Sequence, residues 1–283
     1  EPITTSFDGA INQLDKDLER HIKEYLSIRC GMQEIFTYPW MDETYVNAIL
    51  QSTDGILSLS TPPSPAERFI RSSLLPNLCK AVARNERYYG DFAIFETAQV
   101  FRDENYTTPY DEREKLPSQR KNVAGAFVSA DKDVTALFRK AKGVVEMMPR
   151  YTHMESYTLK QAEKPVWADE VVWLNIYLGE QHIGDLALLS KRVSMACGIK
   201  NVNVMLFQLD QDALVPLRSR TNTFTHLAEY PMTDYDISLL LDGEVKWADV
   251  AQTIGGVKNE LLHGASFVDE YRGKQVPEGK KSL

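Results

Sequence analysis

The sequence predicts an α+β protein, in which a mostly antiparallel sheet flanked by helices is followed by a small strand-helix-strand piece. The first observation is the order of apolar patterns up to residue 209, which runs long helix, strands, helix, hairpin and strand. The second is a polar stretch at 218–229 without a clear period. The third is a shorter strand-helix-strand order after that stretch. We therefore expect a large domain at 1–228 and a smaller one at 229–283.

The composition excludes two broad classes of protein. The 283 residues are 43% hydrophobic and 25% charged, and the formal net charge is -8. Because binding to phosphates needs clustered Lys and Arg, a protein that coats nucleic acid by charge alone is excluded. No run approaches the ~18 consecutive apolar residues of a membrane helix, and the start has no leader-like region. We expect a soluble, cytoplasmic protein without a membrane partner, whose cysteines Cys30, Cys79 and Cys197 are reduced packing residues.

The first elements are predicted from their spacing. From Ile11 to Leu26 apolar residues recur every three or four positions, which predicts one long amphipathic helix ended by Gly31. Residues 33–40 are rich in β-branched and aromatic types, which predicts a strand, and Pro39 indicates that the end of this strand lies at a sheet edge or leaves the sheet. Residues 61–65 contain three prolines and predict a loop.

The middle of the chain predicts a helix, a buried strand and a long loop. The apolar spacing over 74–83 predicts a helix whose first turn tolerates Pro76, which lacks an N–H group. Residues 92–101 are apolar on both faces, which favours a strand covered on both sides. The polar stretch 102–119 is expected to be an exposed excursion.

The remaining elements follow the same signals. We expect a strand at 121–129, a helix capped by Asp133 and ended by Pro149, a hairpin of 171–178 and 181–189 around Gly179-Glu180, and a strand at 202–209. In the smaller domain we expect strands at 236–242 and 265–271, and between them a helix from Trp247 to Leu261 that Gly255-Gly256 interrupts. A piece of this size exposes an unpaired sheet edge, so the chain is expected to be cut inside a domain.

Two neighbouring runs carry a resemblance to a known family. Arg71-Ser72-Ser73-Leu74-Leu75-Pro76-Asn77-Leu78 and Asp91-Phe92-Ala93-Ile94-Phe95-Glu96-Thr97-Ala98-Gln99-Val100-Phe101 resemble the core of the bacterial phenylalanyl-tRNA synthetase beta subunit. The resemblance implies a class II synthetase-like core domain that is not itself catalytic.

A second resemblance begins at Tyr230-Pro231. It continues through Asp236-Ile237-Ser238, Phe267-Val268-Asp269-Glu270-Tyr271-Arg272-Gly273 and Pro277-Glu278-Gly279-Lys280-Lys281-Ser282-Leu283. These runs resemble the opening part of the ferredoxin-like anticodon-binding domain of the same subunit. Tyr235 stands where that family usually has Arg. The resemblance thus implies a C-terminal fragment of the subunit with a truncated anticodon-binding domain.

The resemblance implies a role in tRNA aminoacylation as a scaffold. It implies the catalytic alpha subunit and tRNA as partners, a heterotetramer, and ATP and Mg used by the holoenzyme rather than by this chain. Large apolar groups on one strand after a long helix predict an exposed interface with the alpha subunit. The candidates are Ile35, Phe36, Tyr38 and Trp40. Positive charge near the C-terminus makes Arg272, Lys274, Lys280 and Lys281 the candidates for tRNA contact.

No catalytic, cofactor or metal residue is predicted in this chain. Phe101-Arg102-Asp103-Glu104 is similar to the Phe-Arg-x-Glu of the second class II motif, but no Gly-rich arginine motif follows 202–209. The five histidines lack the spacing of metal ligands. Two alternatives stay open: a self-contained ATP-dependent ligase that uses Arg102 and Glu104, and an autonomous RNA-binding module.

Overall fold

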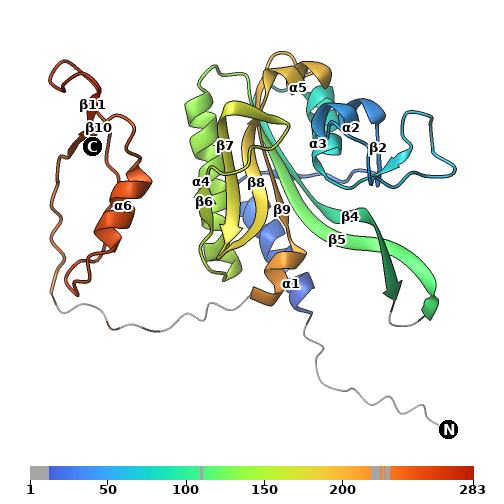
Figure 1. Ribbon diagram of the computed structural model, residues 1–283, viewed down its shortest axis with the longest axis horizontal. Coiled ribbons are helices and arrows are strands. Elements are labelled where there is room, and N and C mark those ends of the chain that lie inside the picture. The colour runs from blue at the N-terminus through green and yellow to red at the C-terminus, as the bar shows by residue number, and fades with distance from the viewer. Residues whose placement is uncertain (1–12, 109–110, 218–223, 225, 227–229) are drawn as a thin grey trace, which may run out of the picture. The chain divides into compact units, whose positions relative to one another are not determined.

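The computed structural model describes residues 13–108, 111–217, 224, 226 and 230–283. The chain divides into two compact units, Glu1–Asn222 and Thr223–Leu283. The expected boundary at 228/229 lies outside the described residues. Unit 1 is built on a seven-stranded sheet with the order β1-β4-β5-β9-β8-β7-β6, and every neighbouring pair is antiparallel except β1 with β4 (Figure 1). The predicted α+β class with a mostly antiparallel sheet is confirmed.

The strands of this sheet are β1 (Gln33–Glu34), β4 (Phe92–Thr108), β5 (Asp111–Ser129), β6 (Thr158–Lys160), β7 (Ala168–Leu178), β8 (Gln181–Leu189) and β9 (Asn203–Asp210). A small second sheet joins β2 (Trp40–Met41) to β3 (Phe69–Ile70). The predicted hairpin of β7 and β8 is confirmed, and Gly179 in its turn has φ +59°, a backbone conformation that glycine adopts without strain.

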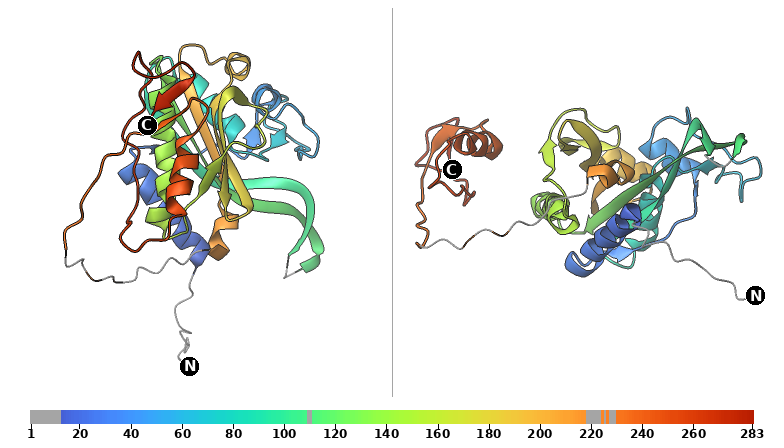
Figure 2. Two further views of the ribbon diagram at one scale, coloured as in Figure 1. Left: turned by 60° about the vertical axis from the view of Figure 1, so that its left-hand side comes forward. Right: turned by 90° about the horizontal axis from the view of Figure 1, so that it is seen from below.

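Helices cover both faces of the sheet (Figure 2). One face carries α1 (Leu14–Glu24), a π-helical turn (Tyr25–Arg29) and α4 (Val134–Thr152), and its core includes Leu18, Phe127 and Phe207. The other face carries α2 (Glu43–Ile49), α3 (Leu75–Asn85) and α5 (Lys191–Ala196). A 3-10 helix (Asp212–Leu217) ends the described part of unit 1. None of the helices in the described ranges has the length and apolar character needed to cross a bilayer.

The first predicted helix is confirmed from residue 14 onward, while Ile11 lies outside the described residues. Gly31 follows its π-helical last turn with φ +67°, as expected of a helix stop. The predicted strand 33–40 is wrong in its middle, because only Gln33–Glu34 and Trp40–Met41 are strands. Between them, the Ile35 N–H group still bonds the Phe95 carbonyl and the Pro39 carbonyl accepts from the Arg71 N–H group, whereas the main chain of Thr37 and Tyr38 is bonded by side chains.

The stretch 102–119, predicted as an exposed excursion, instead continues the sheet. β4 and β5 pair from Phe92 with Val128 out to Thr108 with Asp111, with a register shift between Arg102 and Asn105. β9 pairs with β5 only from residue 122 onward, so the outer part is a two-stranded ribbon (Figure 1). The prediction failed because cross-strand bonds satisfy the main chain even where the side chains are polar.

The predicted cap of α4 is confirmed, but its predicted end is wrong. The Asp133 carboxylate accepts hydrogen bonds from the N–H groups of Thr135 and Ala136. The helix continues past Pro149 to Thr152 and ends at His153, which has φ +57°. Pro149 lies in the last turn, where its missing N–H group removes one hydrogen bond without preventing three more helical residues.

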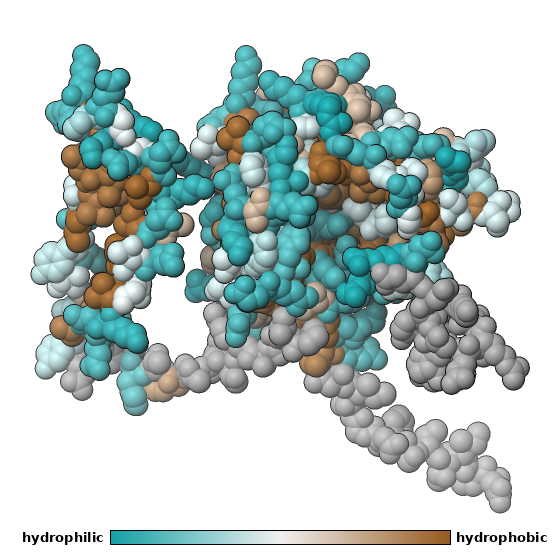
Figure 3. Space-filling model, in the orientation of Figure 1, coloured by the Kyte–Doolittle hydropathy of each residue, from teal (hydrophilic) through white to brown (hydrophobic). Residues whose placement is uncertain are grey.

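Unit 2 has shorter strands than predicted. β10 (Leu240–Asp242) pairs with β11 (Lys280–Ser282), and α6 (Trp247–Gly255) ends at the glycine pair, before Leu261. The predicted strand 265–271 is present only as a bridge between Tyr271 and Ser282. Apolar side chains gather on the surface of this unit (Figure 3), and Val257, Leu261 and Val268 are among the exposed ones.

Candidate functional site

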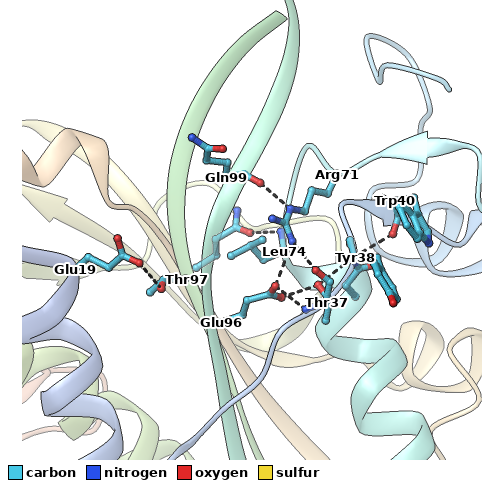
Figure 4. Close-up of polar contacts among 11 residues, drawn as sticks. Glu19, Thr37, Tyr38, Trp40, Arg71, Leu74, Glu96, Thr97 and Gln99 are labelled. Carbon is cyan, nitrogen blue, oxygen red and sulfur yellow. Dashed lines mark hydrogen bonds and ion pairs between the residues drawn. The ribbon is translucent and has the colours of Figure 1, made fainter. Parts of the chain in front are cut away.

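Large aromatic side chains project from the segment that joins β1 to β2 and includes Trp40 at the start of β2, which we call the aromatic segment (residues 35–40; Figure 4). Ile35 packs inward against the core beneath α2 and α3, whereas Phe36 is 80% exposed and Tyr38 is 70% exposed. The Tyr38 ring stacks on the Trp40 ring, with centroids 4.5 Å apart and planes inclined by 6°. The predicted interface residues therefore do not form one fully exposed patch, because Ile35 and Trp40 are both half-buried.

At Thr37, the main chain of the aromatic segment is held by a side chain instead of by a neighbouring strand. The N–H group of Ile35 donates to the carbonyl oxygen of Phe95 at 2.8 Å, which completes the pairing of β1 with β4. Two residues later, the N–H group of Thr37 donates to Glu96 Oε1 at 2.9 Å, and its hydroxyl donates to Glu96 Oε2 at 2.7 Å. A carboxylate on β4 thus replaces the main-chain acceptor of the strand ladder.

Arg71 and Asn77 bind the carbonyl side of the same segment. Arg71 Nη1 donates to the Thr37 carbonyl at 3.2 Å and to Glu96 Oε1 at 3.1 Å, and Nε donates to the Gln99 carbonyl at 2.6 Å. Asn77 Nδ2 lies within donor distance of the carbonyls of Tyr38 at 2.9 Å and Trp40 at 3.3 Å. We call Arg71, Asn77 and Glu96 the anchoring triad, since each bonds the aromatic segment.

The triad lies in a buried environment. Arg71 is 9% exposed and Glu96 is 1% exposed. Burial lowers the pKa of Arg71, while the neighbouring Glu96 carboxylate acts in the opposite direction. A buried ion pair of this kind persists only when its desolvation is offset by good geometry and further hydrogen bonds. The bonds to Thr37 and Gln99 are those further partners.

The motif run that contains Arg71 also places the start of α3. The Ser73 hydroxyl and the Leu74 N–H group both donate to Gln208 Oε1 at 2.9 Å, which joins the helix start to β9. Pro76 lies in the first turn, where an N–H group is not required. The predicted helix and its tolerance of Pro76 are confirmed.

Sequence reasoning did not assign roles to Arg71, Asn77 and Glu96, although all three belong to the runs that carry the family resemblance. The signal was present in the strand 92–101, where Glu96 is a charged residue in a pattern that is otherwise largely apolar on both faces. A charged side chain in such a strand needs a partner, but the sequence does not say which residue supplies it.

Two lysines close to the aromatic segment, Lys23 and Lys80, are each paired with two carboxylates. Lys23 lies 5.7 Å from the centre of the Phe36 ring and binds Glu34 at 2.8 Å and Glu19 at 3.2 Å. Lys80, on α3, binds Asp42, two residues after Trp40, at 3.3 Å and Glu67 at 2.7 Å. Burial acts to lower the pKa of Lys80, but the hydrogen bonds to these carboxylates outweigh it and the pKa is raised.

Of the two candidates for nucleotide chemistry, Arg102 and Glu104, the structure describes the side chain of Arg102 alone. Arg102 is exposed on the β4–β5 ribbon, at the edge of its register shift, and the Glu104 side chain lies outside the described residues. Within the described ranges, no group of three or more His, Cys, Asp and Glu side chains could hold a metal ion.

Three of the four predicted tRNA contacts have acidic partners in unit 2. Arg272 Nε donates to Glu270 at 2.6 Å, and Lys281, which is 5% exposed, donates to the same carboxylate at 2.9 Å. These two hydrogen bonds lower the pKa of Glu270. Lys280 donates to Asp242 at 3.0 Å, whereas Lys274 is exposed. The buried Lys281 thus has a structural contact in its own unit.

The fold defines unit 1 as a class II aminoacyl-tRNA synthetase-like domain. It is similar to the structure of pyrrolysyl-tRNA synthetase from Desulfitobacterium hafniense, with a TM-score of 0.55 over 71% of this chain and 68% of that chain. The identity is 12%, so this likeness shows the fold alone.

The family follows from two matches of family descriptions to the sequence. Residues 4–211 match the phenylalanyl tRNA synthetase beta chain CLM domain, and residues 228–283 match the ferredoxin-fold anticodon binding domain. The chain belongs to the phenylalanyl-tRNA synthetase beta chain family, which confirms the resemblance found in the sequence.

Relatives named phenylalanine–tRNA ligase beta subunit align with nearly the whole chain. That of Carboxydothermus hydrogenoformans is 27% identical over 99% of this chain and 35% of its own length. That of Bacillus subtilis is 27% identical over 93% of this chain and 33% of its own length. The chain therefore spans about a third of the length of these relatives.

Proposed function

We propose that this chain is a non-catalytic portion of the beta subunit of phenylalanine–tRNA ligase, which scaffolds the alpha subunit during tRNA aminoacylation in the cytoplasm. The observation that carries the proposal is the aromatic segment, in which Phe36 and Tyr38 are exposed while the main chain between them is firmly bonded. Aromatic side chains are enriched at the centres of protein interfaces and supply much of their binding energy.

The size of this contribution follows from burial. Covering a Phe side chain contributes about 1.5–3 kcal/mol. Because Phe36 is 80% exposed, a partner that covers it gains most of that amount. Phe36→Ala is then expected to weaken the complex by roughly 10-fold to 100-fold, since about 1.4 kcal/mol is a factor of ten.

The surface favours a protein partner over RNA at this site. Proteins that stack nucleic-acid bases on aromatic rings combine those rings with free Lys and Arg that bind phosphates. Here Lys23 and Lys80 each bind two carboxylates. The RNA contribution of the chain is proposed for unit 2 instead, where Lys274 is exposed and Arg272 and Lys280 share their charge with acidic neighbours.

ATP and Mg are proposed to bind the alpha subunit rather than this chain. Arg102 is exposed on a two-stranded ribbon, and holding a phosphate for catalysis requires several preorganised donors at one place. The alternative of a self-contained ligase predicts phenylalanine-dependent ATP–pyrophosphate exchange by the chain alone, and loss of that exchange in Arg102→Ala.

The test is co-purification with a phenylalanyl-tRNA synthetase alpha subunit from the same source, together with the exchange assay on the chain alone. We expect a complex, no exchange by the chain alone, and weaker binding for Phe36→Ala and Tyr38→Ala. Tyr88→Ala is the matched control, because Tyr88 is an exposed aromatic residue after α3, outside the aromatic segment. Equal loss of binding in all three variants, or exchange by the chain alone, would contradict the proposal.

A further inference from the structure

We propose that Arg71, Asn77 and Glu96 are positioning residues for a protein interface: they hold the aromatic segment away from the sheet so that Phe36 and Tyr38 face the partner. This inference rests on the proposed function, because it concerns how the same surface is presented to the alpha subunit. It assigns to the most distinctive residues of the two motif runs a role in binding rather than in folding alone.

The path of the main chain shows where the aromatic segment leaves the sheet. β1 pairs with β4 only at Gln33 with Ile94 and Glu34 with Phe95, and the Ile35 N–H group makes the last main-chain bond to β4. If the ladder continued, the next acceptor would be another carbonyl of β4. The Thr37 N–H group instead binds the Glu96 carboxylate, which extends from β4 on its own side chain. The main chain at Thr37 is therefore separated from the main chain of β4 by the length of a glutamate side chain.

Anchoring at Thr37 also sets which side chains of the segment face outward. Exposure alternates along residues 35–38, with Phe36 and Tyr38 exposed and Ile35 and Thr37 half-buried, as it does where successive side chains point to opposite sides of an extended chain. Because the Thr37 hydroxyl is fixed inward on Glu96 and Asn77, its neighbours Phe36 and Tyr38 point outward. Asn77 holds the residues that follow Thr37 by donating to the carbonyls of Tyr38 and Trp40. The stacked pair of Tyr38 and Trp40 is thus held from its main chain.

A rigid aromatic segment binds its partner more tightly than a mobile one. A surface that is already in its bound conformation does not lose further conformational freedom on association, which strengthens binding without any new contact. A short irregular segment with two exposed aromatic side chains would otherwise sample many conformations. The triad supplies donors and acceptors to residues 37, 38 and 40 from two separate elements, β4 and the motif run that begins α3.

The experiment compares the affinity of the full chain for the alpha subunit in two backgrounds. In the native background, Glu96→Gln removes the charge that binds Arg71 and is expected to weaken binding about tenfold. In a Phe36→Ala/Tyr38→Ala background, the same change is expected to alter affinity less than twofold, because the side chains that it positions are gone. An equal loss in both backgrounds would overturn the inference.

Matched variants separate positioning from simple destabilisation. Ser73→Ala removes the hydrogen bond from Ser73 to Gln208, and neither residue bonds the aromatic segment. This variant is expected to lower the melting temperature without changing the affinity for the alpha subunit. Asn77→Ala leaves the charges of the triad in place, and it replaces Glu96→Gln in the binding experiment if Glu96→Gln does not fold. Hydrogen exchange at the Thr37 amide supplies a direct readout, and we expect at least a tenfold acceleration in Glu96→Gln.

The outcomes distinguish the two proposals. If the native chain does not bind the alpha subunit, the proposed function fails and this inference fails with it. If the native chain binds, and Glu96→Gln and Asn77→Ala keep full affinity or an unchanged Thr37 exchange rate, only the positioning role fails.

Discussion

Replacing the partners of the Arg71–Glu96 pair one at a time is expected to cost far more than their isolated contact would suggest. Arg71→Met leaves the Glu96 carboxylate, which is 1% exposed, without its cation, and Glu96→Met leaves a 9% exposed guanidinium without its anion. Breaking a buried pair from either side costs about 3–5 kcal/mol, because a buried charge remains uncompensated. Unit 1 comprises residues 1–222, a size at which each kcal/mol shifts Tm by about 2–4 °C, so each variant should melt roughly 6–20 °C lower.

The double variant provides the decisive measurement. Because Arg71→Met/Glu96→Met leaves neither charge buried, its cost should fall below the sum of the single costs by about 2–3 kcal/mol. Urea unfolding of the four proteins gives the coupling free energy, and it is followed by the fluorescence of the three unit 1 tryptophans, Trp40, Trp167 and Trp173, in a Trp247→Phe background. Arg20 and Asp17, an exposed ion pair 3.3 Å apart, form the control cycle and should couple by less than about 1 kcal/mol. A coupling at Arg71 and Glu96 no larger than that of the control would refute the reasoning.

Three further predictions concern stability. Gly184→Ala should destabilise unit 1 by about 1–3 kcal/mol in urea unfolding, because a Cβ atom there would lie 2.0 Å from the Gln208 carbonyl oxygen, whereas Gly143→Ala on the open side of α4 should stabilise by up to about 1 kcal/mol. Burial acts to raise the pKa of Glu19, but its hydrogen bonds to Lys121 and Lys23 outweigh burial and the pKa is lowered. The stability that these bonds give is therefore present above the ordinary pKa of 4.5 and lost as the pH falls through the lowered pKa. In Glu19→Gln, the loss of stability with falling pH should be smaller. Lys281→Ala should make unit 2 more susceptible to proteolysis by breaking its buried contact with Glu270, while the exposed Lys274→Ala should not.

Elements with a strong local period were predictable from the sequence. The helix from residue 14, the helix that begins at Leu75 and the hairpin around Gly179 all follow from apolar spacing and turn residues. The Asp133 cap was predictable for the same reason, since its carboxylate bonds N–H groups only two and three residues away. The family was also recognisable, because its motif runs are contiguous in the chain.

Local pattern was insufficient where hydrogen bonds could be made in two ways. The polar stretch after Phe101 looked like a loop, yet its main chain pairs across a long hairpin. The apolar stretch 33–40 looked like one strand, yet it leaves the sheet after residue 35. In both cases the choice depends on which partner is available in space, and side-chain polarity alone does not encode that.

The fold class, the three longest helices of unit 1 and the family were readable from the sequence, because these depend on periodicity and on contiguous motifs. The residues that form the candidate site became apparent only in the folded chain. Thr37 and Glu96 are 59 positions apart, and Tyr38 and Asn77 are 39 apart. Thr37 meets Glu96 because β1 lies beside β4, and Tyr38 meets Asn77 because α3 packs on the sheet next to these strands. A buried carboxylate takes as its partners whichever donors the folded chain brings within hydrogen-bond reach, so its role became readable only in three dimensions.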